Sequence, residues 1–463
     1  MDRSQQLGSE KIRTLLIRLS MPATIAMVVS AMYNIVDSIF IGRGVGVMAI
    51  GGLTVAFPVQ MAVMALAQMI GIGAASAVSR NLGANNREKA RQVAGNSYIM
   101  AGLLGILICV LGLLFITPIL RIFGATDVLM PYARDYLQVI LIGSLYFPFV
   151  MSVNNLIRAE GNARVAMFVM LTGTLSNIIL DYLFIFPMQM GIRGAALATI
   201  ISQFLSLVLV LIYLNSEHST LKTALHHMKP DWTIQLEILK VGSSSFGRQV
   251  AGSLMAIVLN NSLVFYGGEL ALSVFGVVHR VIMFLFMPMF GIVQGMQPIA
   301  GYNYGAKRMD RVKEVVKLAI IGTTAFATVS TLFGELFPGT IIRLFNDDPL
   351  LIENGTLALR IVIAMIPLVG VQIIGAALFQ ALGKALPAMV LTLSRQLLFL
   401  VPLVLILPRI NGLGLLGIWI AFPLSDVLST IFTTIMMRRE MKLMERNMAL
   451  ETAAKPLSSS SPV

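Results

Sequence analysis

The amino-acid sequence predicts an all-α integral membrane protein, and three observations lead to that prediction. Of the 463 residues, 57% are hydrophobic and only 12% are charged, whereas soluble domains carry about 25% charged residues. The mean hydropathy is +0.84. The apolar residues also form continuous segments longer than the roughly 20 residues that a helix needs to cross a bilayer. Membrane β-strands would instead be about ten residues long and alternate in polarity, so a β-barrel is excluded.

Twelve such segments can be marked along the chain. We expect membrane-crossing helices at 15–42, 53–79, 92–117, 133–158, 164–187, 193–214, 238–266, 271–299, 314–338, 355–382, 386–408 and 413–437. The polar stretch 215–237 separates two sets of six. The predicted organisation is a cytoplasmic N-terminus at 1–14, a first lobe at 15–214, a cytoplasmic connector at 215–237, a second lobe at 238–437 and a cytoplasmic tail at 438–463, with a disordered end from about Met448.

The basic residues indicate which side of the membrane holds the termini. Twelve crossings place both termini on one side, and that side carries 24 of the 34 Lys and Arg residues, whereas the opposite side carries 7. Cytoplasmic loops are enriched in Lys and Arg, so we expect both termini in the cytoplasm. The net charge of +12 has the same explanation, and no nucleic-acid partner is expected.

A repeat at an offset of 222 residues relates the two halves. Gly73, Asn81, Gly83 and Ala84 match Gly295, Asn303, Gly305 and Ala306, and a second loop around Gly161 and Gly383 matches at the same offset. Because each half has six helices, both halves enter the membrane in the same orientation. We expect two pseudo-symmetric lobes with a substrate path between them, as in transporters that rock one lobe against the other. A duplicated bundle without transport is the alternative.

One acidic residue, Asp37, lies inside the first apolar segment, in the stretch YNIVDSIFIGR at 33–43. Ionisable groups at membrane depth are costly and usually mark an ion or substrate path. In the fifth segment Asn177 and Asp181 are four residues apart and therefore share a helix face. Asp37, Asp181 and Thr199 of the sixth segment lie at similar depths, so we expect them to converge in the first lobe.

These side chains could bind a coupling cation in two ways. Two neighbouring carboxylates do not both ionise cheaply, so they could share a proton. Na⁺ would instead be bound by oxygens of Asp37, Asn177, Asp181 and Thr199. Asp181 taken alone could also cap its helix or face water. The second lobe has apolar residues at the positions that match Asp37, Asn177 and Asp181, namely Leu259, Phe399 and Leu403. Its acid Asp426 is expected to form an internal ion pair with Arg280 and Arg395, with a place in the substrate cavity as the alternative.

Several motifs are absent from the sequence. No GxxxxGK[ST] phosphate loop occurs, so an ATP-driven pump is not expected. The 4 His and 1 Cys have no metal-ligand spacing; we expect His226 and His227 in a solvated loop and Cys109 as a buried thiol. No catalytic Ser-His-Asp or HExxH arrangement is found. The chain is therefore not expected to be an enzyme or to need a cofactor, and an ion gradient is expected to supply the energy.

LSRQLLFLVPLVLILP followed by GLLGIWIAFPLSD looks most like the MepA-like and DinF-like bacterial members of the multidrug and toxic compound extrusion (MATE) family, and four further stretches together resemble that family. They are YNIVDSIFIGRGVG, NLGANNREKA, RAEGNAR and GMQPIAGYNYGAKRMDRVK. The resemblance implies twelve helices in two six-helix lobes and export of organic cations in exchange for Na⁺ or H⁺. It also implies cation coupling at Asp37, Asn177, Asp181 and Thr199, and substrate-cavity positions at Tyr33, Tyr136 and Asn154. Some family members carry acids in the seventh and tenth helices, and this sequence has none there.

The sequence thus predicts a cation-coupled antiporter of the bacterial plasma membrane that exports small, mostly cationic organic compounds. We expect it to act as a monomer surrounded by membrane lipid. A lipid- or polysaccharide-precursor flippase is the closest alternative. Its anionic cargo would favour a basic cavity, and Arg248, Arg280 and Arg395 are the only Lys or Arg residues that lie away from the ends of the predicted spans. A structural or sensory membrane protein would show no gradient-dependent flux.

Overall fold

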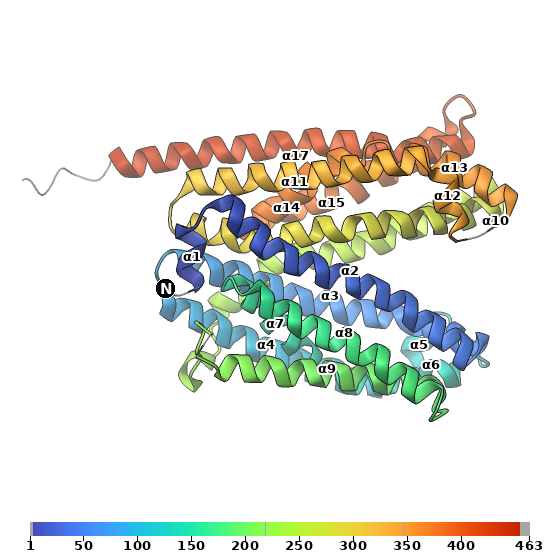
Figure 1. Ribbon diagram of the computed structural model, residues 1–463, viewed down its shortest axis with the longest axis horizontal. Helices are drawn as coiled ribbons and strands as arrows, with labels where there is room; N and C mark the ends of the chain where they lie inside the picture. The colour runs from blue at the N-terminus through green and yellow to red at the C-terminus, as the bar shows by residue number, and fades with distance from the viewer. Residues whose placement is uncertain (1–2, 218, 346, 454–463) are drawn as a thin grey trace, which may run out of the picture.

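The computed structural model describes residues 3–217, 219–345 and 347–453, and every regular element in them is helical (Figure 1). The first half contains α1 (Arg3–Ser9), α2 (Ile12–Gly44), α3 (Val47–Gly83), α4 (Arg87–Leu114), α5 (Ile116–Ile122), α6 (Met130–Gly143), α7 (Phe147–Ala159), α8 (Ala163–Ile185) and α9 (Gly191–Asn215). The connector holds η1 (Leu225–Met228). The second half contains α10 (Trp232–Gly305), α11 (Met309–Leu336), α12 (Pro338–Arg343), α13 (Pro349–Ile363), α14 (Ile366–Ala381), α15 (Ala385–Leu393), the π-helix η2 (Ser394–Leu400), α16 (Val401–Ile406), η3 (Leu407–Arg409) and α17 (Gly414–Ala453).

Nine helical stretches and two bent helix pairs are long and apolar enough to cross a membrane. The bent pairs are α6 with α7, at 51°, and α13 with α14, at 49°. The long helix α10 crosses twice, because Gly268 has a non-helical φ of 66° and divides it into a first arm (232–267) and a second arm (269–305). The described residues therefore account for twelve crossings, which confirms the all-α membrane fold.

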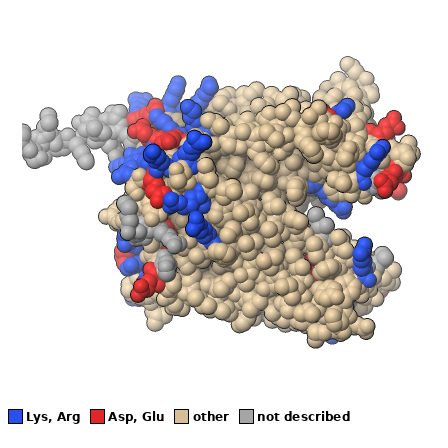
Figure 2. Space-filling model, viewed as in Figure 1, with Lys and Arg blue, Asp and Glu red and all other residues tan. Residues whose placement is uncertain are grey.

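The helices are arranged in two lobes (Figure 1). Helices α2 to α9 lie in one lobe and α10 to α17 in the other; the lobes meet at the end that carries the N-terminus and separate toward the opposite end. Figure 2 shows the resulting notch between the lobes, and it shows charged residues gathered at the two ends with an uncharged band between them. Basic residues are more abundant at the end that carries the N-terminus. This distribution is that of a protein whose middle lies in lipid.

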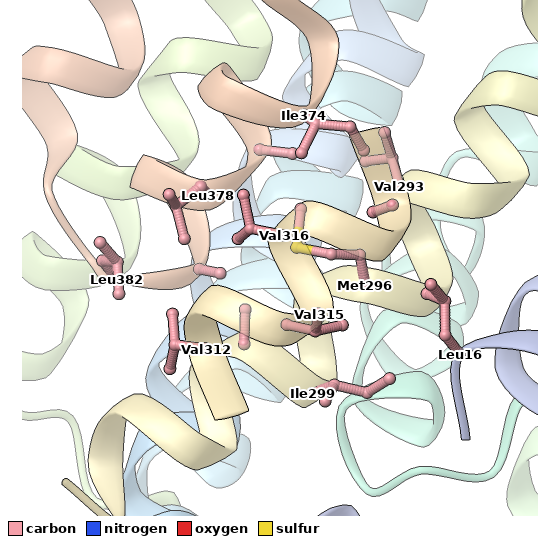
Figure 3. Packing of buried hydrophobic residues seen from close by; sticks show 14 of the residues in the cluster. Leu16, Val293, Met296, Ile299, Val312, Val315, Val316, Ile374, Leu378 and Leu382 are labelled. Atoms are coloured by element: carbon pink, nitrogen blue, oxygen red, sulfur yellow. The ribbon is translucent and has the colours of Figure 1, made fainter. Parts of the chain in front are cut away.

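Apolar packing supplies the interior of each lobe. In the second lobe, Val293, Met296 and Ile299 of α10 pack against α11 and α14, and Leu16 of α2 joins them (Figure 3). The first-lobe core includes Val153 and Ile157 of α7, together with residues of α3, α4, α8 and α9. Burial of such side chains contributes roughly 25 cal/mol per Å² of apolar surface removed from water. In the bilayer, where lipid is equally apolar, close packing and polar contacts take over that role.

The lobes are joined by a close crossing of α3 with the second arm of α10. A side-chain carbon on Gly83 would lie 1.8 Å from the backbone oxygen of Tyr302, and one on Gly305 would lie 1.9 Å from that of Arg80. These two contacts are reciprocal, because both residue pairs are related by the 222-residue repeat. Gly73 and Gly242 make similar contacts, with Ile238 and Met69. Only glycine permits backbones to approach so closely, so the glycines of the repeat mark the junction of the lobes.

The structure differs from the sequence prediction in the C-terminal tail and in the connector. The polar tail was expected to be disordered from about Met448, but α17 continues to Ala453; residues 454–463 lie outside the described residues. The connector is more ordered than a plain loop, since η1 lies within it and α10 begins at Trp232, capped by two backbone N–H groups that donate to the Asp231 side chain.

Candidate functional site

The carboxyl groups of Asp37 on α2 and Asp181 on α8 lie side by side, within hydrogen-bonding reach of each other. Asp181 is fully buried, and neither of its carboxyl oxygens meets a donor in regular hydrogen-bond geometry among the described residues. Asn177, one turn earlier on α8, lies beside Asp181 and is also buried, but its amide nitrogen does not meet that geometry either. Two ionised carboxylates at this separation repel each other, so the arrangement calls for a shared proton or a bound cation.

Hydroxyl groups surround this carboxyl pair. Tyr33, one turn before Asp37, hydrogen-bonds Thr199 of α9, whose own hydroxyl donates to the backbone oxygen of Ala195 at 3.0 Å. Tyr136 of α6 is buried near Asp37 and Asp181, and its hydroxyl accepts a hydrogen bond of 3.1 Å from Gln60 of α3. Five helices of the first lobe therefore contribute polar groups to one place. The contribution of Gln60 was missed in the sequence, where a single Gln in an apolar segment gives no signal.

Two other predicted site residues lie elsewhere. Asn154 of α7 is buried and donates to the backbone oxygen of Ala166 at 3.0 Å, so it ties α7 to α8 and is not part of the carboxyl group cluster. Asp426 of α17 is buried in the second lobe, where its Oδ1 is 2.7 Å from Nε of Arg395. Arg280 does not take part in this ion pair, and no described carboxylate lies within 4.0 Å of it.

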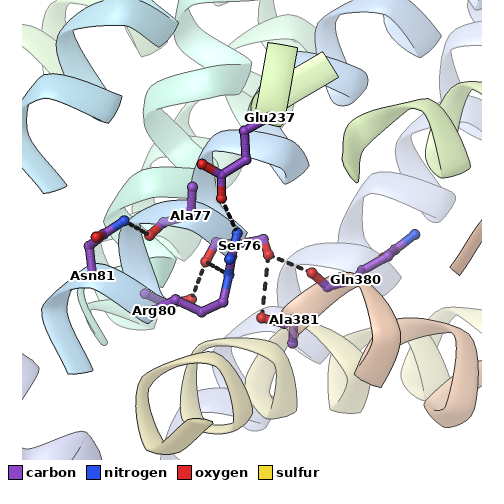
Figure 4. A network of polar contacts seen from close by, with 8 residues as sticks. Ser76, Ala77, Arg80, Asn81, Glu237, Gln380 and Ala381 are labelled. Atoms are coloured by element: carbon purple, nitrogen blue, oxygen red, sulfur yellow. Dashed lines mark hydrogen bonds and ion pairs between the residues drawn. The ribbon is translucent and has the colours of Figure 1, made fainter. Parts of the chain in front are cut away.

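Polar contacts close the gap between the lobes at the end that carries the N-terminus (Figure 4). Arg80 of α3 forms an ion pair of 2.7 Å with Glu237 of the first arm of α10, and the hydroxyl of Ser76 donates to the backbone oxygen of Gln380. Close by, Arg158 donates to Oε1 of Gln294 at 2.8 Å, again from one lobe to the other. A cavity of ≈ 30 Å³ lies among these residues. Position in the sequence placed Arg80 and Arg158 near loops but could not identify their partners.

The histidine pair in the connector is less exposed than expected. His226 is 64% exposed, but His227 is only 3% exposed, so the prediction of a solvated loop is wrong for His227. Its Nε2 lies 3.1 Å from Glu88, and its Nδ1 accepts a hydrogen bond of 2.8 Å from the backbone N–H of Ala224. With Nδ1 accepting, the neutral ring carries its proton on Nε2, which faces Glu88. The cluster of Glu88, His226 and His227 therefore fits a polar contact better than a metal site.

Comparisons with known proteins agree with this architecture. A family model described as MatE matches residues 22–183 and 247–406. The chain is 27% identical over 394 residues to the multidrug export protein MepA of Staphylococcus haemolyticus (strain JCSC1435), covering 85% of this chain and 86% of that protein. It is similar to an outward-facing structure of a multidrug resistance MATE family transporter, with a TM-score of 0.91, 28% identity and coverage of 95% and 98%. It is also similar, with a TM-score of 0.90, 28% identity and the same coverage, to a Pyrococcus furiosus transporter described by the reverse polarity of its binding pocket.

Proposed function

The chain belongs to the MatE family of multidrug export transporters, and on that premise we propose that it is an antiporter that exchanges an external cation for an exported organic compound. The single observation that carries the proposal is the pair formed by the half-buried Asp37 and the fully buried Asp181. A buried carboxyl pair without a basic partner is costly unless it binds a positive ion. Such a pair is therefore suited to take up and release one during each cycle.

The coupling ion is H⁺ or Na⁺. A single proton shared between Asp37 and Asp181 would remove their repulsion without any further ligand. Na⁺ would use the same carboxyl oxygens together with the side-chain oxygens of Asn177 and Thr199, in keeping with the preference of hard cations for oxygen ligands. The Thr199 hydroxyl donates its hydrogen to Ala195, so its oxygen can accept from Tyr33 and still has a second lone pair for a cation.

The exported compound would pass between the two lobes. With the basic end of the molecule in the cytoplasm, the notch between the lobes opens to the outside, and the contacts of Arg80 and Arg158 close the inner side. Binding of the cation in the first lobe changes the packing of α2 and α8 and lowers the affinity of the cavity for the exported compound. Export follows if the two ligands favour different lobe arrangements.

Replacing one carboxyl group tests the proposal. In membrane vesicles with an imposed pH or Na⁺ gradient, Asp37→Asn should abolish gradient-driven transport of a cationic dye such as ethidium, because a neutral amide cannot release a proton or balance Na⁺. Asp135→Asn is the matched control, since Asp135 is an exposed acid that pairs with Arg193 at the outer end of the same lobe. Imposing the two gradients separately identifies the ion. Full transport by Asp37→Asn would contradict the proposed mechanism.

The alternative is a flippase for a lipid or polysaccharide precursor. The two candidates differ in cargo: a flippase moves a labelled lipid between leaflets of a vesicle in preference to a soluble dye. Small organic compounds are the proposed cargo of this chain, and a monomer suffices for the mechanism because both lobes belong to one polypeptide.

A further inference from the structure

We propose that the second lobe holds a recognition site for the carboxylate of an aromatic substrate, centred on Arg248 and Phe290. The inference rests on the proposed export function and narrows it. The exported compounds would then include aromatic acids and zwitterions beside the organic cations that the sequence predicts.

The site begins with one face of the second arm of α10. Phe286, Phe290 and Gln294 are spaced four residues apart, so they lie above one another at intervals of about 6 Å. Each of the three side chains is in contact with a guanidinium group. Arg395 of η2 lies over the ring of Phe286, with Cζ 5.3 Å from its centroid, and Arg248 of the first arm lies over Phe290 at 5.4 Å. Arg158 of the first lobe donates to Gln294. Four helical elements thus bring three guanidinium groups into one row.

The three charges differ in how they are balanced. Arg395 is paired with Asp426, whose second carboxyl oxygen is buried without a hydrogen bond from any described residue. Arg158 donates only to neutral groups, namely Gln294, Asn155 and the sulfur of Met170. Arg248 has no described carboxylate within 4.0 Å. The row therefore carries an excess of positive charge in a part of the protein where unbalanced charge is expensive.

Arg248 lies one helical turn beyond the contacts of the inner junction. One turn before it on the first arm, the hydroxyl of Ser244 accepts a hydrogen bond of 3.0 Å from Gln380, and one turn beyond Phe290, Gln294 meets Arg158 of the other lobe. These contacts belong to the closed inner end. Arg248 is exposed to water although its guanidinium group lies over the ring of Phe290. A compound bound between the lobes could therefore reach Arg248 next to the closed contacts.

The chemistry of this place favours an aromatic acid. A guanidinium group can bind a carboxylate through two parallel hydrogen bonds, and its contact with a ring face leaves its edge free to do so. Phe290 is half-buried and provides an apolar aromatic surface for the rest of the compound, and it is held by an edge-to-face contact with the buried Phe286, at 6.4 Å between ring centroids. A compound with a positive charge alone gains no such contact with Arg248. A zwitterion can direct its cationic end toward the acids of the first lobe.

The row of three guanidinium groups also extends along the path that the substrate would follow across the membrane. Arg158 lines the cavity at the inner junction, one turn of α10 further inward than Arg248. When the inner end opens, Arg158 becomes the first guanidinium group that an acid from the cytoplasm meets. The acid passes from Arg158 to Arg248 across about 6 Å, the spacing of adjacent turns.

Two dyes that differ by one charge provide the test. Tetramethylrhodamine carries a free carboxylate, and its methyl ester has the same chromophore without the acid. Binding of each to the purified full-length protein is measured by fluorescence polarisation in detergent, without an ion gradient. We expect the wild-type protein to bind the acid at least about ten-fold more tightly than the ester, and Arg248→Gln to lose that preference, because one charge-assisted pair is removed. Arg360→Gln, which removes an exposed arginine from the same lobe, should leave the preference unchanged.

Further variants separate the site from other roles of Arg248. Arg248→Lys keeps the charge without the two-pronged geometry and should retain part of the preference, which also provides a folded comparison if Arg248→Gln is unstable. Asp37→Asn should abolish gradient-driven flux and leave the ratio of acid to ester affinity unaltered, so failure of ion coupling and failure of this site are distinguishable. Equal wild-type affinity for both dyes, or an equal loss of both in Arg248→Gln, overturns the proposal.

Discussion

Glu160 is the buried acid that lies outside the membrane-crossing helices, in the turn between α7 and α8. Its side chain is 1% exposed. It accepts hydrogen bonds from the Tyr213 hydroxyl at 3.0 Å, the Thr220 backbone N–H at 2.9 Å and the Ser219 hydroxyl at 3.4 Å. Burial raises the pKa of Glu160 from 4.5 to about 7, because the three donors offset only part of the loss of hydration. Glu160 thus holds the connector against the first lobe. Its contribution to the stability of the fold depends on pH.

The sign of this dependence follows from the direction of the shift. A carboxyl group with a raised pKa in the folded state stabilises the fold below its unfolded pKa, and that contribution is lost as the pH rises through the folded value. The stability of the detergent-solubilised protein should therefore fall by roughly 3 kcal/mol between pH 4.5 and pH 8 on account of Glu160. In Glu160→Gln this part of the fall should be absent, since Gln keeps an oxygen for Thr220 and never ionises.

Apparent melting temperatures of both proteins, measured from pH 4.5 to pH 8, test the expectation. Glu217→Gln is the control, because Glu217 is an exposed acid of the same connector. Identical pH profiles for the wild type and Glu160→Gln would mean that Glu160 is hydrated in the folded protein.

At the residue scale, the sequence predicted much of the first-lobe site and little of the junction. Asp37, Asp181 and Thr199 could be placed at one depth, because helix rise converts residue number into depth. Arg80 and Arg158 stand near helix ends, where a basic residue ordinarily faces solvent. Their partners, Glu237 and Gln294, are 157 and 136 residues away along the chain, and no local pattern encodes such pairings.

Among the elements, the crossing of α3 with the second arm of α10 is one of the close backbone contacts between the lobes. Gly305→Ala should disturb it, because the new methyl group would lie 1.9 Å from the Arg80 backbone oxygen and the helices would have to move apart. Overpacking of this kind typically costs about 1–3 kcal/mol, enough to raise the population of the open inner end at least about five-fold. Gly102→Ala is the control, since nothing lies within 4 Å of the added carbon.

Cysteine accessibility measures the opening. In a Cys109→Ser background, Ala75→Cys places a thiol in the inner junction, where Ala75 lines the small cavity between the lobes. Its rate of reaction with N-ethylmaleimide should rise in Gly305→Ala and stay unchanged in Gly102→Ala. A rate unaffected by Gly305→Ala would show that this crossing does not hold the inner end closed.

The elements themselves were only partly predictable. All twelve apolar segments correspond to crossings, but the bends within the fourth and tenth were not foreseen. In each, a new helix starts with proline in its first turn, at Pro148 of α7 and Pro367 of α14. Proline disfavours the helical conformation of the residue before it, yet it is also tolerated in a first turn, so the sequence alone does not distinguish a bend from a helix end. The π-helix that carries Arg395 likewise leaves no trace in hydropathy.

For the molecule as a whole, alternating access requires contacts that exist in one lobe arrangement and are lost in the other. The ion pair of Arg80 and Glu237 has this character, since it joins α3 of the first lobe to the first arm of α10. Its side chains are 19% and 32% exposed, intermediate between a surface pair and a buried one. Removing one partner should therefore cost more than the few tenths of a kcal/mol typical of exposed pairs, because the other charge is left half-buried without a partner.

A double-mutant cycle on this ion pair tests its role in the transport cycle. Glu237→Gln and Arg80→Gln should each increase the labelling rate of Ala75→Cys several-fold, because each removes an attraction that holds the inner end closed. In the double variant, the increase in labelling rate should be well below the product of the two single increases. The difference corresponds to a coupling free energy of about 1 kcal/mol. Asp135→Asn breaks an ion pair within the first lobe at the outer end and should leave the rate unchanged. If the two single effects multiply without coupling, Arg80 and Glu237 act independently, and the inner end is held closed by the glycine crossing and the hydrogen bonds of Ser76 and Arg158.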